Sequence, residues 1–394
     1  MFTKTVNPYN HKLAQAVALS LFALAAKQAQ AVDYSFSDLD TLAGNSTTKY
    51  IAQNLNNLGH VSGYSQNVAS GEIRGTMWNG STWSDLGKLP GAGTQDVGYA
   101  INDHDQVTGI SQFTPELYKP VRWDNGVAVG LDRLPGDAWI SRGNAINDNG
   151  QVTGEAWASE NGPANWHAVR WDGNAITDLG TLTGGSASFA QSINESGQIV
   201  GDGYTANDDF DAAVFWNSDG SIHELQTLSG ASSNGWATGI NNLGQIVGIT
   251  ADADGNSQSV FWASYTAAPV LLSVLSGYSG AVAADINDAG QIVGWATYDA
   301  DNASHLILWD QGNFTDLSSL IPAALAADGM SLSNYLTQIN QDGAIVGRIL
   351  DSGNAAVGSY LLTPVAVPVP GAVWLFGSAL AGFIGMKRRK QAAL

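Results

Sequence analysis

The side chains best suited to chemistry in this sequence are carboxylates in three acidic stretches, at residues 208–211, 252–256 and 299–302. The middle stretch reads Asp-x-Asp-Gly-Asn, which places oxygen ligands on one side of a tight turn, as Ca²⁺ binding requires. No Glu follows at the distance that an EF-hand loop needs, and the three stretches differ from one another. Two interpretations therefore stay open: a calcium site, or solvated acidic turns in a protein without a cofactor.

Other residue types that carry catalysis do not form a recognisable motif. The His residues beyond the first 31 positions are scattered, and no two have metal-ligand spacing: His60, His104, His167, His223 and His305. The sequence has no Gly-x-Ser-x-Gly nucleophile elbow and no glycine-rich phosphate loop with a Lys. Two carboxylates could still meet in a shared channel, as glycosidases require. We therefore assign no catalytic residue and keep a carbohydrate-active enzyme as an alternative hypothesis.

Aromatic side chains offer a further chemistry, which is stacking against sugar rings. Seven of them recur at one place in a repeated unit, and we interpret these as packing between units: Trp78, Trp123, Trp171, Trp216, Trp262, Trp309 and Tyr360. Five Trp residues do not recur and lie in or beside predicted connecting loops: Trp139, Trp157, Trp166, Trp236 and Trp295. Because binding residues concentrate in loops, these five are the candidates for ligand contact.

One phrase, Ile or Leu before an Asn, then a turn and a strand ending in Gly, occurs seven times. Its Asn residues lie about 46 residues apart, except for a last step of 53: Asn56, Asn102, Asn147, Asn194, Asn241, Asn287 and Asn340. Each unit holds four short apolar segments separated by turns, which is the size of one β-propeller blade. The longer last step contains residues 322–329, where a leading Pro and a closing Gly predict one or two helical turns. We expect the repeated Asn to cap its own turn rather than to bind a ligand.

The order of these segments predicts a closed ring. Residues 36–44 supply a fourth strand before the first hairpin, whereas the seventh repeat ends after its third strand at residues 360–362. The N-terminal strand can then complete the last blade, which leaves no strand edge open at the ends of the array. The sequence thus predicts an all-β protein, a seven-bladed β-propeller of residues 32–364 that is closed by its N-terminal strand.

Charge and composition restrict the partners. The chain has 16 Lys and Arg against 35 Asp and Glu, a net charge of −19, and seven of the basic residues lie outside residues 32–364. Such an acidic surface repels phosphate backbones, so the composition excludes nucleic-acid binding. There is no Cys, and disulfides therefore play no part in any compartment that the protein reaches.

Residues 1–31 have the three parts of a secretory signal peptide. A basic start that includes Lys4 and Lys12 precedes an apolar stretch at residues 13–26, and Ala29 and Ala31 occupy positions −3 and −1 of a cleavage site. An amphipathic core helix is the alternative, but the stretch has no polar face. We predict export and cleavage after Ala31.

Residues 365–394 have the features of a second targeting signal, at the C-terminal end of the sequence. Pro368 and Pro370 precede an uncharged segment, residues 371–386, and a basic cluster follows: Lys387, Arg388, Arg389 and Lys390. As a helix this segment spans about 24 Å, short of a typical hydrocarbon core. The arrangement resembles the PEP-CTERM sorting tail of Gram-negative bacteria, with Val369 in place of the usual Glu.

This resemblance implies a transmembrane helix at residues 371–386 that anchors the protein transiently in the inner membrane. It also implies an exosortase-type processing enzyme as a partner, with release to the cell surface or the exopolysaccharide matrix. A permanent single-span anchor is the alternative for the same segment.

The repeats between the two predicted targeting signals are similar to the extracellular repeats named HAF. The similarity rests on the Ile-Asn phrase, on the Asp-Leu-Gly-x-Leu-x-Gly phrase at residues 178–184 and on the closing Leu-Leu-Thr-Pro at residues 361–364. The His of the family name occurs in two copies only, as His167 and His305. The resemblance implies an architecture and a compartment, and no reaction.

Together these features predict a non-enzymatic, exported protein of the cell surface or extracellular matrix. We expect it to bind polysaccharide or envelope partners through propeller loops. The alternatives are a carbohydrate-active enzyme, a glycosidase or lyase that uses channel carboxylates, and a structural spacer without a ligand.

Overall fold

The computed structural model describes residues 33–39, 47–137, 140–158, 165–206, 211–228, 234–301, 303–332 and 337–365. The chain divides into two compact units, Phe36–Thr363 and a second unit made of Met1–Ser35 and Pro364–Leu394. Of the second unit only strand ends are described. The predicted cleavage residues Ala29 and Ala31 lie outside the described residues. So do the predicted helix at residues 371–386 and the sorting residues around it: Pro368, Pro370, Lys387, Arg388, Arg389 and Lys390.

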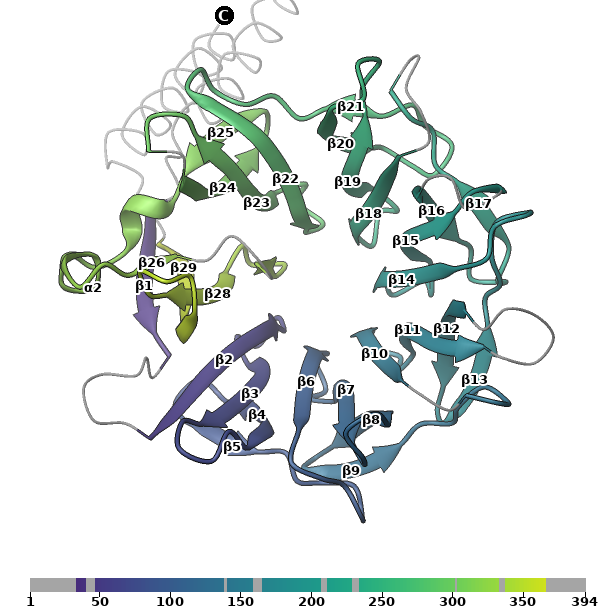
Figure 1. The fold of residues 1–394 in the computed structure, drawn as a ribbon. Coiled ribbons are helices and arrows are strands. Elements are labelled where there is room, and N and C mark those ends of the chain that lie inside the picture. Colours follow the sequence, from purple (N-terminus) through teal and green to yellow (C-terminus); the bar gives the residue numbers. More distant parts are fainter. Residues whose placement is uncertain are drawn as a thin grey trace, which may run out of the picture. The chain divides into compact units, whose positions relative to one another are not determined.

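The larger unit is a ring of seven antiparallel sheets, the blades, each built from one repeat (Figure 1). In blades 1 to 6 the strands pair in chain order, from the inner strand to the outer one. Blades 1 to 3 contain β2 (Thr48–Leu55), β3 (Val61–Asn67), β4 (Ile73–Trp78) and β5 (Trp83–Asp85); β6 (Asp96–Ile101), β7 (Val107–Gln112), β8 (Tyr118–Asp124) and β9 (Val127–Gly130); and β10 (Ser141–Ile146), β11 (Val152–Ala158), β12 (Asn165–Asp172) and β13 (Ala175–Asp178).

Blades 4 to 6 follow the same plan. They contain β14 (Ser188–Ile193), β15 (Ile199–Tyr204), β16 (Asp211–Trp216) and β17 (Ile222–Glu224); β18 (Gly235–Ile240), β19 (Ile246–Ala251), β20 (Ser257–Trp262) and β21 (Val270–Leu271); and β22 (Tyr278–Ile286), β23 (Ile292–Tyr298), β24 (Ala303–Asp310) and β25 (Asn313–Asp316). Two short helices precede blade 7, η2 (Ser318–Leu320) and α2 (Ala323–Ala327), and α2 confirms the helical turn predicted at residues 322–329.

Blade 7 closes the ring as the sequence predicts. It contains β26 (Ser331–Leu332), β27 (Gln338–Ile339), β28 (Ile345–Leu350) and β29 (Ala356–Val365), and β1 (Asp33–Asp38) pairs with β29 as the outermost strand. The backbone N–H of Leu39 donates to Ser359 O at 2.9 Å, and the Phe36 ring stacks on Tyr360 with 6.1 Å between centroids. Blade 7 is also joined to blade 1, where the Ala52 N–H donates to the Ser359 hydroxyl at 2.7 Å. The predicted seven-bladed β-propeller is confirmed.

The recurring aromatics fill the space between blades, which confirms their predicted role. Trp123, Trp171, Trp216, Trp262 and Tyr360 are fully buried, Trp309 is nearly so and Trp78 is partly buried. Several of their indole N–H groups reach the loop after the outer strand of the preceding blade. Trp123 Nε1 donates to Gly87 O at 3.0 Å and Trp262 Nε1 donates to Gln226 O at 2.8 Å. Because a buried indole needs an acceptor, these bonds fix each blade against its neighbour.

No helix among the residues that the structure describes is both long enough and apolar enough to cross a membrane.

Candidate functional site

The inner strands carry an irregularity that turns unpaired residues toward the centre of the ring. In β2, β6, β10, β14, β18 and β22 the register with the second strand shifts three residues before the repeated Asn. A β-bulge of this kind leaves one residue unpaired and re-aims its side chain. The phrase that follows the bulge is repeated, whereas the bulged residues are of five types, with Gln in two blades: Gln53, Tyr99, Asn144, Gln191, Thr238 and Ala284.

In blades 1 to 6 the Gly that closes the repeated phrase makes this bulge feasible. Gly63 lies opposite Ala52, beside the bulge of β2. A Cβ atom on Gly63 would lie 2.2 Å from Ile51 O, and one on Gly201 would lie 1.9 Å from Phe189 O. Since real side chains do not approach a backbone oxygen so closely, any other residue would displace the inner strand. The repeated Gly therefore serves the shape of the channel wall.

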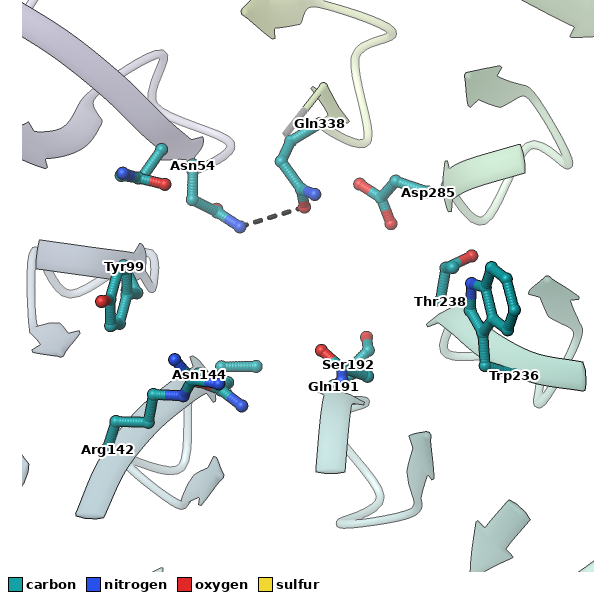
Figure 2. A pocket seen from close by; sticks show the side chains of 12 residues that line it. Asn54, Tyr99, Arg142, Asn144, Gln191, Ser192, Trp236, Thr238, Asp285 and Gln338 are labelled. Carbon is teal, nitrogen blue, oxygen red and sulfur yellow. Dashed lines mark hydrogen bonds between the residues drawn. The ribbon is translucent and has the colours of Figure 1, made fainter. Parts of the chain in front are cut away.

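The bulges surround a central cavity of about 440 Å³. Its wall includes side chains from all seven blades, which face a common space in Figure 2. Most of them are amides or hydroxyls: Gln53, Asn54, Asn144, Gln191, Gln338, Tyr99, Ser192 and Thr238. Asn54 Nδ2 donates to Gln338 Oε1 at 3.1 Å across the junction of blades 1 and 7. The cavity therefore offers many hydrogen-bonding groups with capacity left for a ligand.

A single Trp interrupts this polar wall. Trp236 lies on β18 next to Thr238 in the wall, and 37% of its surface is exposed (Figure 2). An indole face beside amides can pack on the C–H face of a ring-shaped polar ligand while the amides bind its hydroxyls.

An arginine and its carboxylate partner lie on the β10 side of the cavity. The Arg142 side chain is 43% exposed and forms an ion pair with Glu155, whose side chain is 1% exposed. Burial raises the pKa of Glu155, and the charge of Arg142 offsets part of that shift. Arg142 Nε and Glu155 Oε2 are buried and have no hydrogen-bond partner among the described residues. The pair thus holds a donor group at the cavity wall.

A second carboxylate stands on the opposite side of the cavity (Figure 2). Asp285 Oδ1 accepts the Ile286 N–H at 2.8 Å and Oδ2 accepts the Ile339 N–H at 3.0 Å, which joins blade 6 to blade 7. Among the described residues no cation pairs with Asp285, and burial raises its pKa to about 6. Behind the wall, burial and then the nearby Asp211 raise the pKa of Asp202 to about 7, against a hydrogen bond from Gln191.

The asparagine ring lies next to the cavity, at the hairpin turns. Each repeated Asn donates its Nδ2 to the backbone oxygen of the repeated Asn in the next blade, at 2.9 to 3.0 Å, and the seventh returns to the first: Asn56, Asn102, Asn147, Asn194, Asn241, Asn287, Asn340. The same side chains accept backbone N–H groups of their own turns, as for Asn56 Oδ1 with Leu58 and His60. The predicted capping role is confirmed, and the contact between blades is an addition to it.

A second closed ring, the acceptor ring, follows one residue later. In each blade the backbone N–H of the residue after the repeated Asn donates to a side-chain oxygen of the next blade, at 2.7 to 3.0 Å. Its members are Asn57, Asp103, Asp148, Glu195, Asn242, Asp288 and Gln341. The two rings line a hollow of about 180 Å³ that shares Asn54, Ser192, Asp285 and Gln338 with the central cavity.

The described residues of the acidic stretches proposed for Ca²⁺ do not line the cavity. Residues 208–210 and Asn302 are outside the described residues. Asp252 Oδ1 accepts the N–H groups of Asp254 and Asn256, and these bonds hold the pKa of Asp252 below its usual value. In the part of the chain that the structure describes, no three His, Asp or Glu side chains are grouped to hold a metal ion.

The His residues and loop aromatics singled out in the sequence are also placed by the structure. His167 and His305 each bind an Asp of the outer strand of their own blade, Asp178 at 2.8 Å and Asp316 at 2.6 Å. The rings of Trp157 and Trp166 meet edge to face at 5.3 Å across β11 and β12; Trp295 lies in β23 rather than in a loop. Trp139 lies outside the described residues.

Among the unrepeated Trp residues that the structure describes, only Trp236 lines the cavity, and it does so from strand β18. Sequence reasoning missed the remaining cavity residues. The available signal was the two positions before each Ile-Asn phrase, which vary while the phrase does not.

No protein-family model matches this sequence, and no curated protein matches it. Solved structures share the architecture at low identity. An oligogalacturonate lyase in complex with manganese is 12% identical, with a TM-score of 0.52 over 85% of this chain and 97% of that chain. An oligogalacturonate lyase from Vibrio parahaemolyticus is 11% identical, with a TM-score of 0.49 over 84% and 97%.

A puromycin-hydrolyzing peptidase from Mycobacterium tuberculosis is 10% identical, with a TM-score of 0.48 over 86% of this chain and 57% of that chain. At such identities the similarity to the manganese-bound lyase supports the propeller fold and nothing finer.

Proposed function

We propose that the protein is an exported, non-enzymatic component of the cell surface or extracellular matrix of a Gram-negative bacterium. In this proposal it binds saccharide units of a surface polysaccharide in the central cavity. The sequence supports the address through the signal-peptide pattern at residues 1–31, the PEP-CTERM-like tail at residues 365–394 and the HAF-like repeats between them. The sequence led us to expect binding through the propeller loops. Because the cavity is lined by the bulged inner strands, we now place the binding surface on those strands.

The observation that carries the proposal is the set of side chains around the cavity. A sugar presents hydroxyls, each of which donates and accepts, on a ring with apolar C–H faces. The cavity wall provides amides and hydroxyls that can bind these groups. Arg142 is a charged donor in this wall, and Asp285 is an acceptor on the opposite side (Figure 2). Trp236 supplies an apolar face at one place in that wall.

Size and rigidity agree with a small polar ligand. The cavity volume of about 440 Å³ falls within the roughly 300–1,000 Å³ of small-molecule sites. Its groups stand on strands that the asparagine ring and the buried Trp residues hold in place, so little ordering is left to be done on binding.

Titration calorimetry with exopolysaccharide fragments, neutral and uronate-containing, tests this function. Trp236→Ala should weaken binding about tenfold, which corresponds to about 1.4 kcal/mol. Trp157→Ala is the matched control, because Trp157 packs on Trp166 and does not line the cavity. Failure of the unaltered chain to bind any surface polymer would support the structural spacer.

One observation favours the enzyme as the second candidate. Burial near the cavity wall raises the pKa of Asp202 to about 7. A carboxyl group that keeps its proton near neutral pH can serve as a general acid in glycoside cleavage. Release of reducing ends or unsaturated uronates from matrix polysaccharide, lost in Asp202→Asn, would establish this alternative.

Mass spectrometry of the exported protein tests the two predicted targeting signals separately from ligand binding. The proposal expects a chain that begins at Val32 and lacks the apolar tail. An intact C-terminus that retains Trp374 would refute exosortase processing without affecting the cavity argument.

A further inference from the structure

The outer edge of blade 5 differs from the outer edges of the other blades. Its strand β21 and the segment after it expose four apolar side chains: Val270 at 60%, Leu271 at 48%, Val274 at 38% and Leu275 at 54%. β21 pairs with β20 on one side only and is the last strand of its sheet (Figure 1). An apolar edge strand of this kind is a template for pairing with another strand.

The other blades carry a different residue at the position of Leu271. There the residue before the core Leu of the outer strand is an acid in five blades and Gly in one: Asp38, Asp85, Gly130, Asp178, Glu224 and Asp316. A charged side chain at an edge opposes edge-to-edge pairing because pairing would bury the charge. Blades 2 and 5 both lack this acid; β9 of blade 2 exposes one large apolar side chain, Val127 at 62%, whereas blade 5 exposes four.

A second contrast lies three residues after the core Leu of the outer strand. The second Leu of the outer phrase is buried in blade 1 as Leu89, and it packs against the core in blades 2 to 4 as Leu134, Leu182 and Leu228. In blade 5 the equivalent Leu275 is 54% exposed. A residue type that is used for the core elsewhere thus faces solvent here, beside the open edge.

Charge indicates what can cover this edge. The chain carries a net charge of −19, yet residues 255–284 contain no charged side chain. Two copies of so acidic a protein repel each other over most of their surface, and this uncharged segment is where a second copy can approach without opposing carboxylates. The segment is also complementary to itself, since two identical apolar edges match when they are related by a two-fold axis.

We propose that the protein forms a homodimer in which β21 of one copy pairs antiparallel with β21 of a second copy. Antiparallel pairing about a two-fold axis places Val270 of each copy opposite Leu271 of the other, and it joins two four-stranded blades into one continuous sheet. Val274 and Leu275 extend the apolar contact beyond the paired strands. The dimer presents two central cavities, so a polymer with repeating units can be held at both.

Sedimentation velocity of the full chain over a concentration series tests the proposal. Leu271→Asp restores the acid found at this position in other blades and should weaken dimerisation by at least about tenfold. Leu243→Asp is the matched control, because Leu243 is 66% exposed on a hairpin turn outside the proposed interface. Thermal unfolding of both variants separates loss of pairing from loss of fold.

Each outcome is decisive. Dimers that form in the unaltered chain and in Leu243→Asp but not in Leu271→Asp support the interface, and added salt should strengthen them by screening the repulsion between acidic copies. A chain that stays monomeric up to about 1 mM, an affinity of only about −4 kcal/mol, overturns the dimer and leaves a foreign apolar strand as the occupant. Dimers that survive Leu271→Asp place the interface elsewhere. Binding of a single saccharide unit is a separate measurement, and neither result predicts the other.

Discussion

The asparagine ring and the central cavity lie next to each other, but the ring uses the same residue in every blade and the cavity wall does not. In the ring one residue type occurs in all seven blades, and each copy donates to the next at 2.9 to 3.0 Å. In the cavity wall, three residues earlier in the same strands, nearly every blade supplies a different side chain. Identical residues satisfy one another in a closed ring, whereas unlike residues leave hydrogen-bonding groups free. The repeated positions therefore hold the ring together, and the unrepeated ones are available for a ligand.

The Trp residues follow the same division. Trp171 recurs, is fully buried and donates Nε1 to Asp132 O at 2.7 Å. Trp236 does not recur and remains 37% exposed in the cavity wall. The comparison between repeated and unrepeated residues can be tested by substitutions whose expected effects differ in size.

The largest effect is expected from Trp171→Ala. Removing a buried Trp leaves a cavity and an unpaired carbonyl, and it should lower the free energy of unfolding by about 3–5 kcal/mol. Trp236→Ala should change that free energy by less than about 1 kcal/mol and lower ligand affinity instead. Urea unfolding of the two variants, followed by fluorescence, measures both values. Equal losses of stability in the two variants would show that repeated and unrepeated Trp residues do not differ in their contribution to the fold.

A smaller loss is expected from Asn194→Ala. Asn194 Nδ2 donates to Asn241 O at 3.0 Å, and its Oδ1 accepts the N–H groups of Ser196 and Gln198. Leaving these groups unpaired in a buried turn should cost about 2–3 kcal/mol in the free energy of unfolding.

Asn194→Asp separates the two functions of this side chain, because it keeps the acceptor and loses the donor. Its melting temperature should fall between those of the unaltered chain and Asn194→Ala. A melting temperature equal to that of the unaltered chain would mean that the bond to the next blade adds nothing to stability.

Much of the fold could be predicted because its determinants recur in the sequence. The Asn of each hairpin turn, the spacing of about 46 residues and the spare strand before the first repeat were enough to predict seven blades and their closure by β1. The turn of α2 was predictable from Pro322 and Gly329 because both residues restrict the backbone locally.

The site could not be predicted from the same reasoning. Whether Thr238 pairs with a neighbouring strand or faces the cavity depends on the register between β18 and β19. A local sequence pattern does not determine this register. The exposure of Leu275 was equally hidden, because the matching Leu residues of blades 1 to 4 pack inward. Repetition indicated what each residue does in most blades, and departures from it become visible only in three dimensions.

An intermediate effect, which depends on pH, is expected from Asp202→Asn. Burial raises the folded-state pKa of Asp202 to about 7, above its unfolded value of 3.8. Between these two values the folded state binds more protons than the unfolded state, so the free energy of unfolding falls as pH rises through this window.

Asp202→Asn removes that dependence. At pH 8 the variant should be more stable than the unaltered chain by up to roughly 4 kcal/mol, and at pH 4 the two should be alike. Urea unfolding at a series of pH values provides the measurement. Parallel pH curves for the two proteins would show that Asp202 titrates normally and would weaken the enzyme hypothesis with it.

The smallest effect is expected in the acceptor ring, where acids and amides already mix. Asp148 Oδ1 accepts the Asp103 N–H at 2.7 Å, and in other blades the amide oxygens of Asn242 and Gln341 do the same at 2.8 to 2.9 Å. Asp148→Asn preserves an acceptor and should change the free energy of unfolding by less than about 0.5 kcal/mol, whereas Asp148→Ala should cost about 1 kcal/mol. If Asn were as costly as Ala, the negative charge rather than the acceptor would be required, and a cation bound by the ring would become the explanation to test.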